Sequence, residues 1–590
     1  TGGYGPMGNG ALQPDIISPS NYVSTALGFI EGRAIPGLYQ LPPGYTIAGG
    51  TSTATPTAAG SVAMLISAAK QAGVGYDPYR LKYAVTRGAR WVPHLRANTQ
   101  GNGVISVAGA WDILKRLDAG GQMIEIEGRA PVRHPYSHML ATPHEGVGLY
   151  ERDGWNVGDR GQRMITLTRT SGPSGSMTFT VTWAGNDHRT FSAPSTVTLP
   201  LNQSVDVPIT IAPTQHGGHT AHFTLDHPDV PGYAYRTLAT IVAAETLNAD
   251  NGFTMKNEAE VPRPGIESFF YNVPEGVTAL KVDLTWEDRA VSLAVSRPDT
   301  RSAGGERITT DSGVSQMINS PAAGVWEVRL TDVADTRTFD WEQAKKLEPV
   351  PPTPATVTIT ALSAGVSVMA HGGSVDTSGS DTEGTTYDLW ITNPMAKFDG
   401  GAVNTPLGSA RAETHEITEK EQHIFEVEVL PGSTGLIARA FDATDSDADL
   451  DVYIFDCTGD ECTPARTDAD PEGAESEFVS DPAAGTWKIV VDASNVPSGS
   501  TSYQYLDVVF NPSYGTVSVA DIPQERAEGS RWMAKAHTWT AGMTHDPGRR
   551  PYAALVVEGR TTGGETFLVN LLELATAPAL VSQDRQSGGR

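Results

Sequence analysis

The sequence predicts a multidomain protein in which an α/β segment is followed by several all-β sandwich or jelly-roll domains. Three observations predict this class. The chain has 590 residues, and at about 150 residues per domain this length suggests three to five domains. Apolar residues follow a helical pattern only before residue 120 and alternate with polar residues afterwards. Glycine (62) and proline (40) are abundant, as is typical of turn-rich β architecture.

Three helices are expected in the α/β segment, residues 1–125. The first, Thr53–Ala72, has almost no polar face, so we expect it to be buried. The second is expected at Pro78–Arg87, with Asp77 as its N-cap. The third is expected at Ala108–Ala119. Short apolar runs that suit buried strands accompany these helices, so the segment is predicted to be α/β.

From residue 140 onward, short strands alternate apolar and polar residues, with clear examples beginning at Met164, Met177 and Val205. Glycine, proline, asparagine and aspartate separate them at roughly 8–12-residue intervals, as in sandwich domains arranged in series. The predicted units are a β-sandwich at 140–248, a jelly-roll-like sandwich at 250–345, a stiff proline-rich linker at 346–354, an Ig- or FnIII-like β segment at 355–413, a second jelly-roll-like sandwich at 415–512 and a C-terminal β segment at 513–580.

An internal repeat links two of these units. Residues 320–328 read Ser-Pro-Ala-Ala-Gly-Val-Trp-Glu-Val, and residues 481–489 read Asp-Pro-Ala-Ala-Gly-Thr-Trp-Lys-Ile. A similar strand–turn–strand pattern precedes each of them, at 269–284 and 424–440. We expect the shared element to be a tight turn whose tryptophan anchors the next strand in the core. The units at 250–345 and 415–512 are therefore interpreted as copy 1 and copy 2 of one sandwich.

The charge balance excludes some classes of function. The formal net charge is −26, which argues against binding to a phosphate backbone, so no nucleic acid partner is expected. The sequence contains no run of 18 apolar residues, and we therefore expect no membrane span.

The two cysteines, Cys457 and Cys462, are five positions apart. Such a pair is able to close a small-loop disulfide, which would indicate an oxidising compartment. The alternative is a pair of reduced surface thiols. Two cysteines alone do not provide the four ligands of a structural zinc site.

The strongest chemical signal lies at residues 50–60, Gly-Thr-Ser-Thr-Ala-Thr-Pro-Thr-Ala-Ala-Gly. This pattern places Ser52 between a glycine turn and the start of a helix. Free N–H groups and the helix dipole favour a developing oxyanion at such a position. The simpler interpretation is a serine that caps a buried helix.

These residues resemble the nucleophile motif of the subtilisin-like serine proteases, Gly-Thr-Ser-x-Ala-x-Pro-x-x-x-Gly, at every fixed position. Residues 5–19 and 101–107 also resemble the blocks of that family before and after the serine. The resemblance implies that residues 1–125 are the C-terminal portion of a subtilisin-like catalytic domain with Ser52 as the nucleophile. It further implies that the N–H of Ser52 and the hydroxyl of Thr51, in the turn after Gly50, help to hold the oxyanion.

The chain departs from the family pattern in two ways. Thr53 follows the serine, where the family usually has methionine. The catalytic Asp, catalytic His and oxyanion Asn of the family lie well upstream of the serine, but only 51 residues precede Ser52 and no histidine occurs before His94. We therefore expect a segment N-terminal to this chain to supply these groups. That segment is either another chain produced by cleavage near Thr1 or a part outside this numbering.

Two weaker resemblances concern the rest of the chain. Copy 2 resembles the bacterial pre-peptidase C-terminal domain, a jelly-roll-like appendage of secreted proteases, and copy 1 is a weaker version of it. Residues 148–153, Gly-Leu-Tyr-Glu-Arg-Asp, are similar to a stretch that follows the catalytic domain in tripeptidyl peptidases. The resemblance therefore leaves both an endopeptidase and a tripeptidyl-peptidase-like exopeptidase open.

Aspartates in copy 2 suggest a calcium site, because carboxylates that converge from a loop suit a hard cation. The candidate ligands are Asp445, Asp447, Asp449 and Asp451, and the alternative is a solvated acidic loop. No organic cofactor is implied. A second group of titratable residues, His216, His219, His222 and His227, is interpreted as ordinary strand and turn histidines, because its spacing splits it between two faces.

The sequence as a whole favours a secreted subtilisin-like serine protease that hydrolyses peptide bonds of protein or peptide substrates by an acyl-enzyme mechanism. Its expected partner is the N-terminal fragment that carries Asp and His. The alternative is a non-catalytic secreted β-module protein, with a binding or adhesive function, that retains part of a protease. The two are distinguished by whether a companion segment supplies the missing groups.

Overall fold

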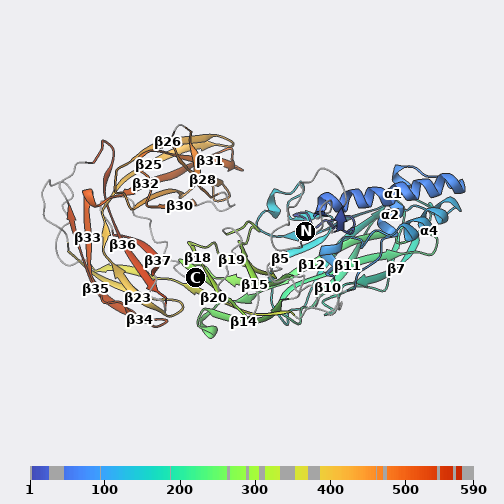
Figure 1. Cartoon of the computed structure of the whole chain (residues 1–590), viewed down its shortest axis with the longest axis horizontal. Coiled ribbons are helices and arrows are strands. Elements are labelled where there is room, and N and C mark those ends of the chain that lie inside the picture. Colours follow the sequence, from blue (N-terminus) through green and yellow to red (C-terminus); the bar gives the residue numbers. More distant parts are fainter. Residues whose placement is uncertain are drawn as a thin grey trace, which may run out of the picture.

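The computed structural model describes residues 3–20, 22–24, 46–48, 50–93, 95–186, 188–261, 266–287, 291–303, 313–332, 352–369, 386–459, 461–468, 475–540, 545–561 and 566–574. The bodies follow one another in an arc (Figure 1). A body with helices and a large sheet occupies one end, a sandwich lies in the middle, and two further sandwiches occupy the other end. The predicted class, an α/β segment followed by all-β domains, is confirmed.

The predicted helices are present with small shifts at their ends. Helix α2 has the predicted bounds, and the Asp77 side chain accepts a hydrogen bond from the Arg80 N–H at 2.8 Å. The left-handed backbone of Gly73, with φ of 69°, ends the first helix. The helices are α1 (Thr51–Ala72), α2 (Pro78–Arg87), α3 (Ala97–Gln100) and α4 (Val107–Asp118), and a short pair of strands, β1 (Tyr22–Ser24) and β2 (Thr46–Ala48), precedes them.

The expectation that the first helix is buried is wrong. Only Leu65 and Ala69 of α1 are buried, and Met64 is 65% exposed. The helix lies on the outer surface of its body (Figure 1). The apolar sequence of α1 therefore leaves an uncovered face among the described residues.

The first sheet has ten strands and shares a core with the helices. Leu65 of α1 and Leu114 of α4 belong to the same apolar cluster as Leu167 and Phe223 of the sheet. The strand order is β8-β10-β6-β3-β5-β12-β11-β7-β9, with β4 paired to β3. Its strands are β3 (Ile126–Arg133), β4 (Glu145–Gly146), β5 (Leu149–Trp155), β6 (Gly161–Arg169), β7 (Met177–Ala184), β8 (Phe191–Ser192), β9 (Thr196–Leu199), β10 (Ser204–Ile211), β11 (Gly217–Asp226) and β12 (Tyr235–Ala243). The sheet thus begins at Ile126, earlier than the boundary at 140.

Copy 1 is a sandwich of two four-stranded sheets. Their orders are β13-β15-β19-β17 and β14-β20-β16-β18. The strands are β13 (Glu245–Thr246), β14 (Thr254–Val261), β15 (Ile266–Val273), β16 (Ala279–Trp286), β17 (Val291–Ser296), β18 (Gly313–Asn319), β19 (Gly324–Asp332) and β20 (Thr353–Leu362). Strand β20 pairs with β14 and β16, so the sandwich extends through Leu362 rather than ending at 345. The expected linker at 346–354 lies mostly outside the described residues.

Copy 2 has a similar arrangement, with a different edge strand in one of its two sheets. One sheet is β26-β31-β28-β29, and the other contains β30-β27-β32-β25. The strands are β25 (Gly408–Thr418), β26 (Gln422–Val429), β27 (Gly435–Phe441), β28 (Asp449–Asp456), β29 (Thr463–Asp468), β30 (Glu475–Ser480), β31 (Gly485–Asn495) and β32 (Ser500–Phe510). Strand β32 lies beside β27 and β25 as β20 lies beside β16 and β14.

The repeated turn has one geometry in both copies. Ser320 and Asp481 each have φ of 47°. The indole N–H of Trp326 donates to the Ala322 carbonyl at 2.8 Å, and that of Trp487 donates to the Ala483 carbonyl at 2.9 Å. Both tryptophans are buried. The sequence repeat therefore corresponds to the same turn, with the same tryptophan hydrogen bond, in both copies.

The remaining strands form a sandwich that is discontinuous in sequence. Strand β22 pairs with β35, and β23 pairs with β36, across more than 100 residues. The strands are β21 (Gly365–Met369), β22 (Thr386–Thr392), β23 (Phe398–Val403), β24 (Thr405–Pro406), β33 (Gly515–Ala520), β34 (Gln524–Arg526), β35 (Arg531–Thr540), β36 (Arg550–Arg560) and β37 (Thr566–Leu574). The segments expected as separate units at 355–413 and 513–580 thus form one sandwich, and copy 2 is inserted into it.

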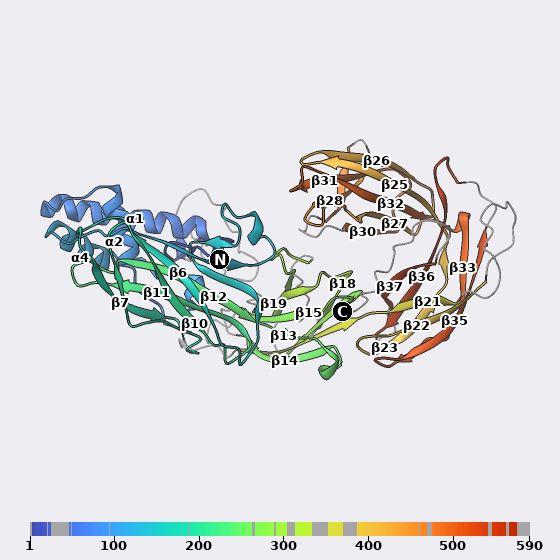
Figure 2. The same cartoon turned by 180° about the vertical axis from the view of Figure 1, so that it is seen from behind.

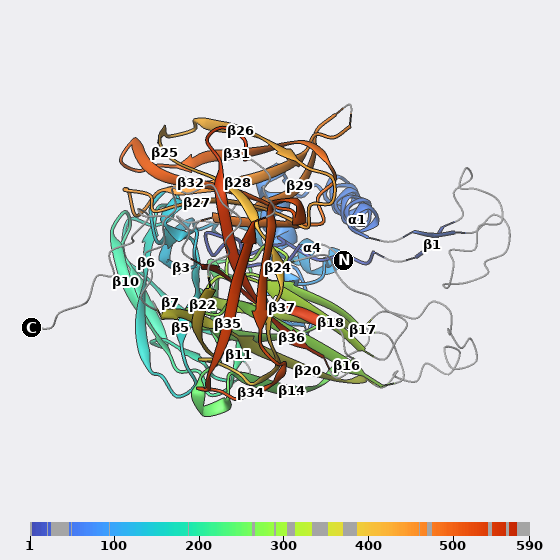
Figure 3. The same cartoon turned by 90° about the vertical axis from the view of Figure 1, so that its left-hand side faces the viewer.

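Neighbouring bodies contact one another along the arc. Strand β37 lies beside β18 of copy 1 in both views along the short axis (Figures 1 and 2), and the Thr278 hydroxyl donates to the Val569 carbonyl at 2.6 Å. At the other side of copy 1, Arg152 Nη1 lies 3.8 Å from Glu327 Oε2. Along the long axis, copy 2 lies above the strands of the discontinuous sandwich (Figure 3). Three short helices, η1 (Ser137–Met139), η2 (Ala249–Asn251) and η3 (Pro512–Tyr514), lie in the connections.

Candidate functional site

Ser52 lies in the first turn of α1. Gly50, two residues before Ser52, has φ of 87°. Glycine is favoured at such a positive φ. This turn directs the chain into the helix, whose first intrahelical bonds run from the N–H groups of Thr53 and Ala54 to the Gly50 carbonyl, at 3.1 and 3.2 Å. The glycine turn therefore places Ser52 at the helix N-terminus, as the sequence predicts.

The hydroxyl of Ser52 and the adjacent N–H groups are available. Both Thr51 and Ser52 are exposed. Among the residues that the structure describes, neither their side chains nor their N–H groups have a hydrogen-bond partner. Free N–H groups at a helix N-terminus stabilise negative charge. The local geometry thus suits an oxyanion beside Ser52.

Thr53 has a structural role that the sequence did not reveal. Its hydroxyl donates to the Gly50 carbonyl at 2.8 Å and also contacts the Ser20 carbonyl. These bonds tie the first turn of α1 to the segment that precedes β1. A methionine at this position would lack the hydroxyl and its contacts with the Gly50 and Ser20 carbonyls.

The two blocks that flank the serine motif in sequence lie against one another. The N–H of Ile17 donates to the Gly103 carbonyl, and the N–H of Ile105 donates to the Ile17 carbonyl, each at 2.9 Å. At Gly101, with φ of 55°, a Cβ atom would lie 1.8 Å from the Pro14 carbonyl oxygen. Glycine is therefore required at position 101, and the two blocks pack closely against each other.

The base that a serine nucleophile needs is not beside Ser52 in the described part of the chain. No imidazole or carboxylate in these residues makes a hydrogen bond to its hydroxyl. His94 lies outside the described residues. A serine hydroxyl without a base is a weak nucleophile.

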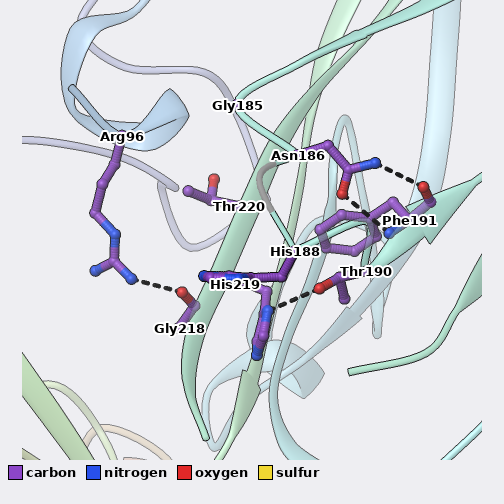
Figure 4. Close-up of a pocket in the computed structure, with 9 residues that line it drawn as sticks. All are labelled: Arg96, Gly185, Asn186, His188, Thr190, Phe191, Gly218, His219 and Thr220. Atoms are coloured by element: carbon purple, nitrogen blue, oxygen red, sulfur yellow. Dashed lines mark hydrogen bonds between the residues drawn. The ribbon is translucent and has the colours of Figure 1, made fainter. Parts of the chain in front are cut away.

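The histidine-rich stretch contributes structural side chains. Figure 4 shows His219 beside His188 in a small cavity of about 60 Å³. One ring nitrogen of His219 bonds the Thr190 hydroxyl at 2.7 Å, and the other bonds the Gln215 carbonyl at 2.8 Å. Burial lowers the pKa of His219 below its ordinary value. With both nitrogens engaged, this imidazole is a core residue, in agreement with the interpretation from sequence.

His222 lies on the same strand and is fully buried. Its Nε2 bonds the Ala97 carbonyl at 3.1 Å, and its ring meets Trp91 edge-on at 5.1 Å between centroids. Burial, reinforced by the nearby Arg236 charge, lowers the pKa of His222 to about 3. The side chain is therefore neutral and joins β11 to the α/β segment.

The acidic residues of copy 2 are engaged in separate hydrogen bonds. Asp445 accepts from the N–H groups of Asp447 and Ser498, at 3.1 and 2.9 Å. Asp451 accepts from the Tyr453 hydroxyl at 3.1 Å and from Ser494. Within the described ranges, no three His, Cys, Asp or Glu side chains are grouped to hold a metal ion. Calcium binding by Asp445, Asp447, Asp449 and Asp451 stays a prediction.

The predicted disulfide between Cys457 and Cys462 is present in the structure. It closes the connection between β28 and β29 in copy 2. Among the described residues, no helix combines the length and the apolar character that a membrane crossing requires.

Comparison with known proteins supports the resemblance carried by the serine motif. The model of the Ig-like domain in actinomycete serine proteases matches residues 127–243, which is the ten-stranded sheet. Pyrolysin of Pyrococcus furiosus is 24% identical over 517 residues, which cover 83% of this chain and 33% of pyrolysin. Tripeptidyl-peptidase 2 of Caenorhabditis elegans is 37% identical over 110 residues, which cover 18% of this chain and 8% of that protein.

The crystal structure of tripeptidyl peptidase 2 aligns over 90% of this chain and 47% of its own, with 13% sequence identity and a TM-score of 0.49. The chain spans about a third of pyrolysin and less than a tenth of the nematode peptidase. The two relatives and the domain model thus make this chain similar to subtilisin-like serine proteases. The similarity supports the interpretation of the chain as a C-terminal part of such a protein with β domains.

Proposed function

We propose that this chain is the C-terminal portion of a secreted subtilisin-like serine protease that hydrolyses peptide bonds, with Ser52 as its nucleophile. The observation that carries the proposal is the exposed Ser52 hydroxyl in the first turn of α1, beside N–H groups without acceptors. It coincides with a serine motif that matches at every fixed position, in a chain similar to subtilisin-like proteases.

The proposed mechanism assigns each step to a group. A histidine from a segment N-terminal to this chain takes the Ser52 proton as the oxygen attacks the scissile carbonyl, and an aspartate of that segment orients the histidine. The Ser52 N–H, the Thr51 hydroxyl and an asparagine of the same segment stabilise the oxyanion. The C–N bond then breaks, the amine leaves with the proton, and water hydrolyses the acyl-enzyme.

The uncovered face of α1 supports the participation of a companion segment. An apolar helix face is stabilised when it packs against other elements, and α1 buries just Leu65 and Ala69 here. We propose that the segment carrying Asp and His packs on this face. The Cys457–Cys462 disulfide and the match to a domain of actinomycete serine proteases support an extracellular location.

The test is active-site labelling by a fluorophosphonate, with this chain produced together with the companion segment. Labelling and proteolysis are expected for the wild type and lost in Ser52→Ala. The matched control is Ser61→Ala in the same helix, where the hydroxyl donates to the Thr57 carbonyl at 2.9 Å, and it should keep both. Unchanged labelling in Ser52→Ala would remove the assignment and favour the non-catalytic alternative.

The type of peptidase is decided by the products. A tripeptidyl peptidase releases tripeptides from a free N-terminus and is stopped by N-acetylation of the peptide, whereas an endopeptidase cleaves both peptides internally. Mass spectrometry of the products of one long peptide, acetylated and free, distinguishes the two.

A further inference from the structure

A cavity of about 460 Å³ lies in the α/β body, which comprises the helices and the ten-stranded sheet up to Ala243. The first turn of α1 does not line it. It is lined by the N-terminal segment, by α2, by the link between α4 and β3, and by the start of β12. Its apolar and aromatic wall includes Leu12, Tyr79, Met123, Ile124 and Tyr235. This volume falls within the range of sites for small organic molecules.

Two arginines that line the cavity both lie over the ring of Tyr233. The guanidinium carbon of Arg236 lies 4.0 Å from the centroid of the Tyr233 ring, and that of Arg87 lies 4.7 Å from the same centroid. Arg87 also lies over the ring of Tyr83, at 3.7 Å. Stacking on aromatic rings holds the guanidinium planes in defined positions.

The hydrogen bonds of these arginines go to neutral oxygens. Arg87 Nε donates to the Tyr233 carbonyl at 2.9 Å. Arg236 donates to the Thr224 hydroxyl at 3.1 Å and to the Asn102 side-chain oxygen at 3.2 Å. Arg236 Nη2 has no acceptor among the described residues. The positive charges are therefore held in place without being neutralised.

The carboxylates around the cavity do not form ion pairs with these two arginines. Asp15 lies 3.7 Å from Lys82, which also lines the cavity. Asp226, whose charge reaches Arg236, accepts a hydrogen bond from Thr182 at 2.7 Å. Glu125 is the other acidic lining residue. In the described part of the chain, no carboxylate lies within 4.0 Å of the Arg87 or Arg236 nitrogens.

This arrangement is unusual in a chain with 68 acidic and 42 basic residues. Acidic side chains are abundant, yet two adjacent half-buried arginines lack one. We propose that the cavity binds a small organic carboxylate, with the carboxylate held by Arg87 and Arg236 and its apolar part against the aromatic wall. The planar fork of a guanidinium matches the two oxygens of a carboxylate, and the apolar wall favours an organic ligand over an inorganic anion.

The experiment measures benzoate binding to the full chain by titration calorimetry, with benzamide as the neutral isostere and inorganic phosphate as the inorganic anion. We expect saturable binding of one benzoate per chain and weaker or absent binding of the other two. Equal binding of benzoate and benzamide would overturn the role of the charge. Phosphate binding as tight as benzoate binding would overturn the assignment to an organic carboxylate.

Three variants locate the site. Arg87→Lys keeps the charge and loses the fork, and it should weaken benzoate binding about tenfold. Lys82→Gln alters a side chain that is 73% exposed, so the fold is retained, and it should weaken binding about threefold through the lost charge. The control Arg80→Gln, on the same helix but paired with Asp77, should leave the affinity unchanged.

Three further outcomes would contradict the proposal. If folded Arg87→Lys and Lys82→Gln, checked by circular dichroism, bind benzoate as the wild type does, benzoate binds elsewhere. If benzoate does not bind and both variants only lower the melting temperature, the two arginines and Tyr233 form a purely structural stack. A crystal structure with benzoate outside the cavity would have the same consequence.

Discussion

At the scale of single residues, burial decides what the ionisable side chains do. His222 is buried and lies near the Arg236 charge, so its charged form is strongly disfavoured even though the Ala97 carbonyl accepts a hydrogen bond from its ring. Ser52, by contrast, is exposed at a helix terminus, where its reactivity depends on a base from elsewhere. The helices and the ten-stranded sheet thus contain a buried neutral histidine and an exposed serine whose hydroxyl has no imidazole or carboxylate partner among the described residues.

The first prediction concerns the pH dependence of stability. The pKa of His222 is about 3 in the folded chain and about 6.5 when unfolded. The unfolded state therefore binds more protons between these values, and the free energy of unfolding falls as the pH falls below about 6.5. The expected slope is up to about 1.4 kcal/mol per pH unit from this residue. Calorimetry of the α/β body between about pH 6.5 and 5, above the range where most carboxylates titrate, measures it.

The matched variants for this prediction are His222→Phe and His138→Gln. His222→Phe should flatten the slope, whereas His138→Gln, which changes an exposed histidine, should keep it. An equal slope in the wild type and His222→Phe would show that other groups, such as His219, account for the acid sensitivity.

The second prediction concerns the acidic loop of copy 2. Bound calcium would raise the melting temperature of copy 2 by mass action, and chelator or Asp449→Ala would lower it. The hydrogen bonds that Asp445 and Asp451 make in the structure would have to rearrange for the carboxylates to converge. Superimposable melting curves in excess calcium and in excess chelator would show a hydrogen-bonded acidic turn without a metal.

At the scale of elements, the repeated turn shows how a short motif determines where the following strand begins and which side chain it places in the sandwich core. Gly324 and Gly485 have φ of 125° and 132°, a backbone that other residues adopt only with strain. Each turn therefore delivers its tryptophan into the sandwich core, where the indole N–H bonds a carbonyl four residues earlier.

The third prediction is that each tryptophan stabilises its own copy. Trp487→Ala should lower the free energy of unfolding of copy 2 by about 3–5 kcal/mol because it leaves a large cavity. Trp487→Phe should cost less, because the ring volume is mostly kept while one hydrogen bond is lost. Domain-resolved calorimetry should show copy 1 unchanged, and Trp326→Ala should give the reverse pattern. A uniform loss across all transitions would contradict independent copies.

At the scale of the whole molecule, copy 2 is an insertion into another sandwich. Its first and last strands begin and end side by side, since Gly408 of β25 pairs with Phe510 of β32. It has its own apolar core, and a smaller apolar cluster that includes Phe510 and Tyr552 joins it to the surrounding sandwich. It is attached through the pairing of β25 with β36 and the ion pair between Arg549 and Asp507.

The fourth prediction follows from this topology. Replacing residues 409–509 by a Gly-Ser linker of two or three residues should leave the discontinuous sandwich folded, because paired strands lie only about 5 Å apart. Residues 408–510 alone should fold cooperatively. Circular dichroism melting and limited proteolysis of both products provide the measurement. As the control, removal of β22 and β23 should unfold the sandwich, and an unfolded linker variant would show that copy 2 is an integral layer.

The sequence by itself determined the local features: the helix bounds, the glycine turn before Ser52, the repeated turns and the disulfide. These depend on residues close together in the chain, where capping, backbone preference and side-chain periodicity are decisive. The serine motif is of this kind, because a glycine turn and a helix start define it within a few residues.

Only the tertiary structure decided which distant strands share a sheet. The pairing of β22 with β35, and of β20 with β14, crosses about a hundred residues or more. Alternation of apolar and polar residues specifies a strand and its buried face but not its neighbour. The cavity between Arg87 and Arg236 and the open face of α1 depend on the same long-range packing. They become visible only when segments far apart in sequence are brought together.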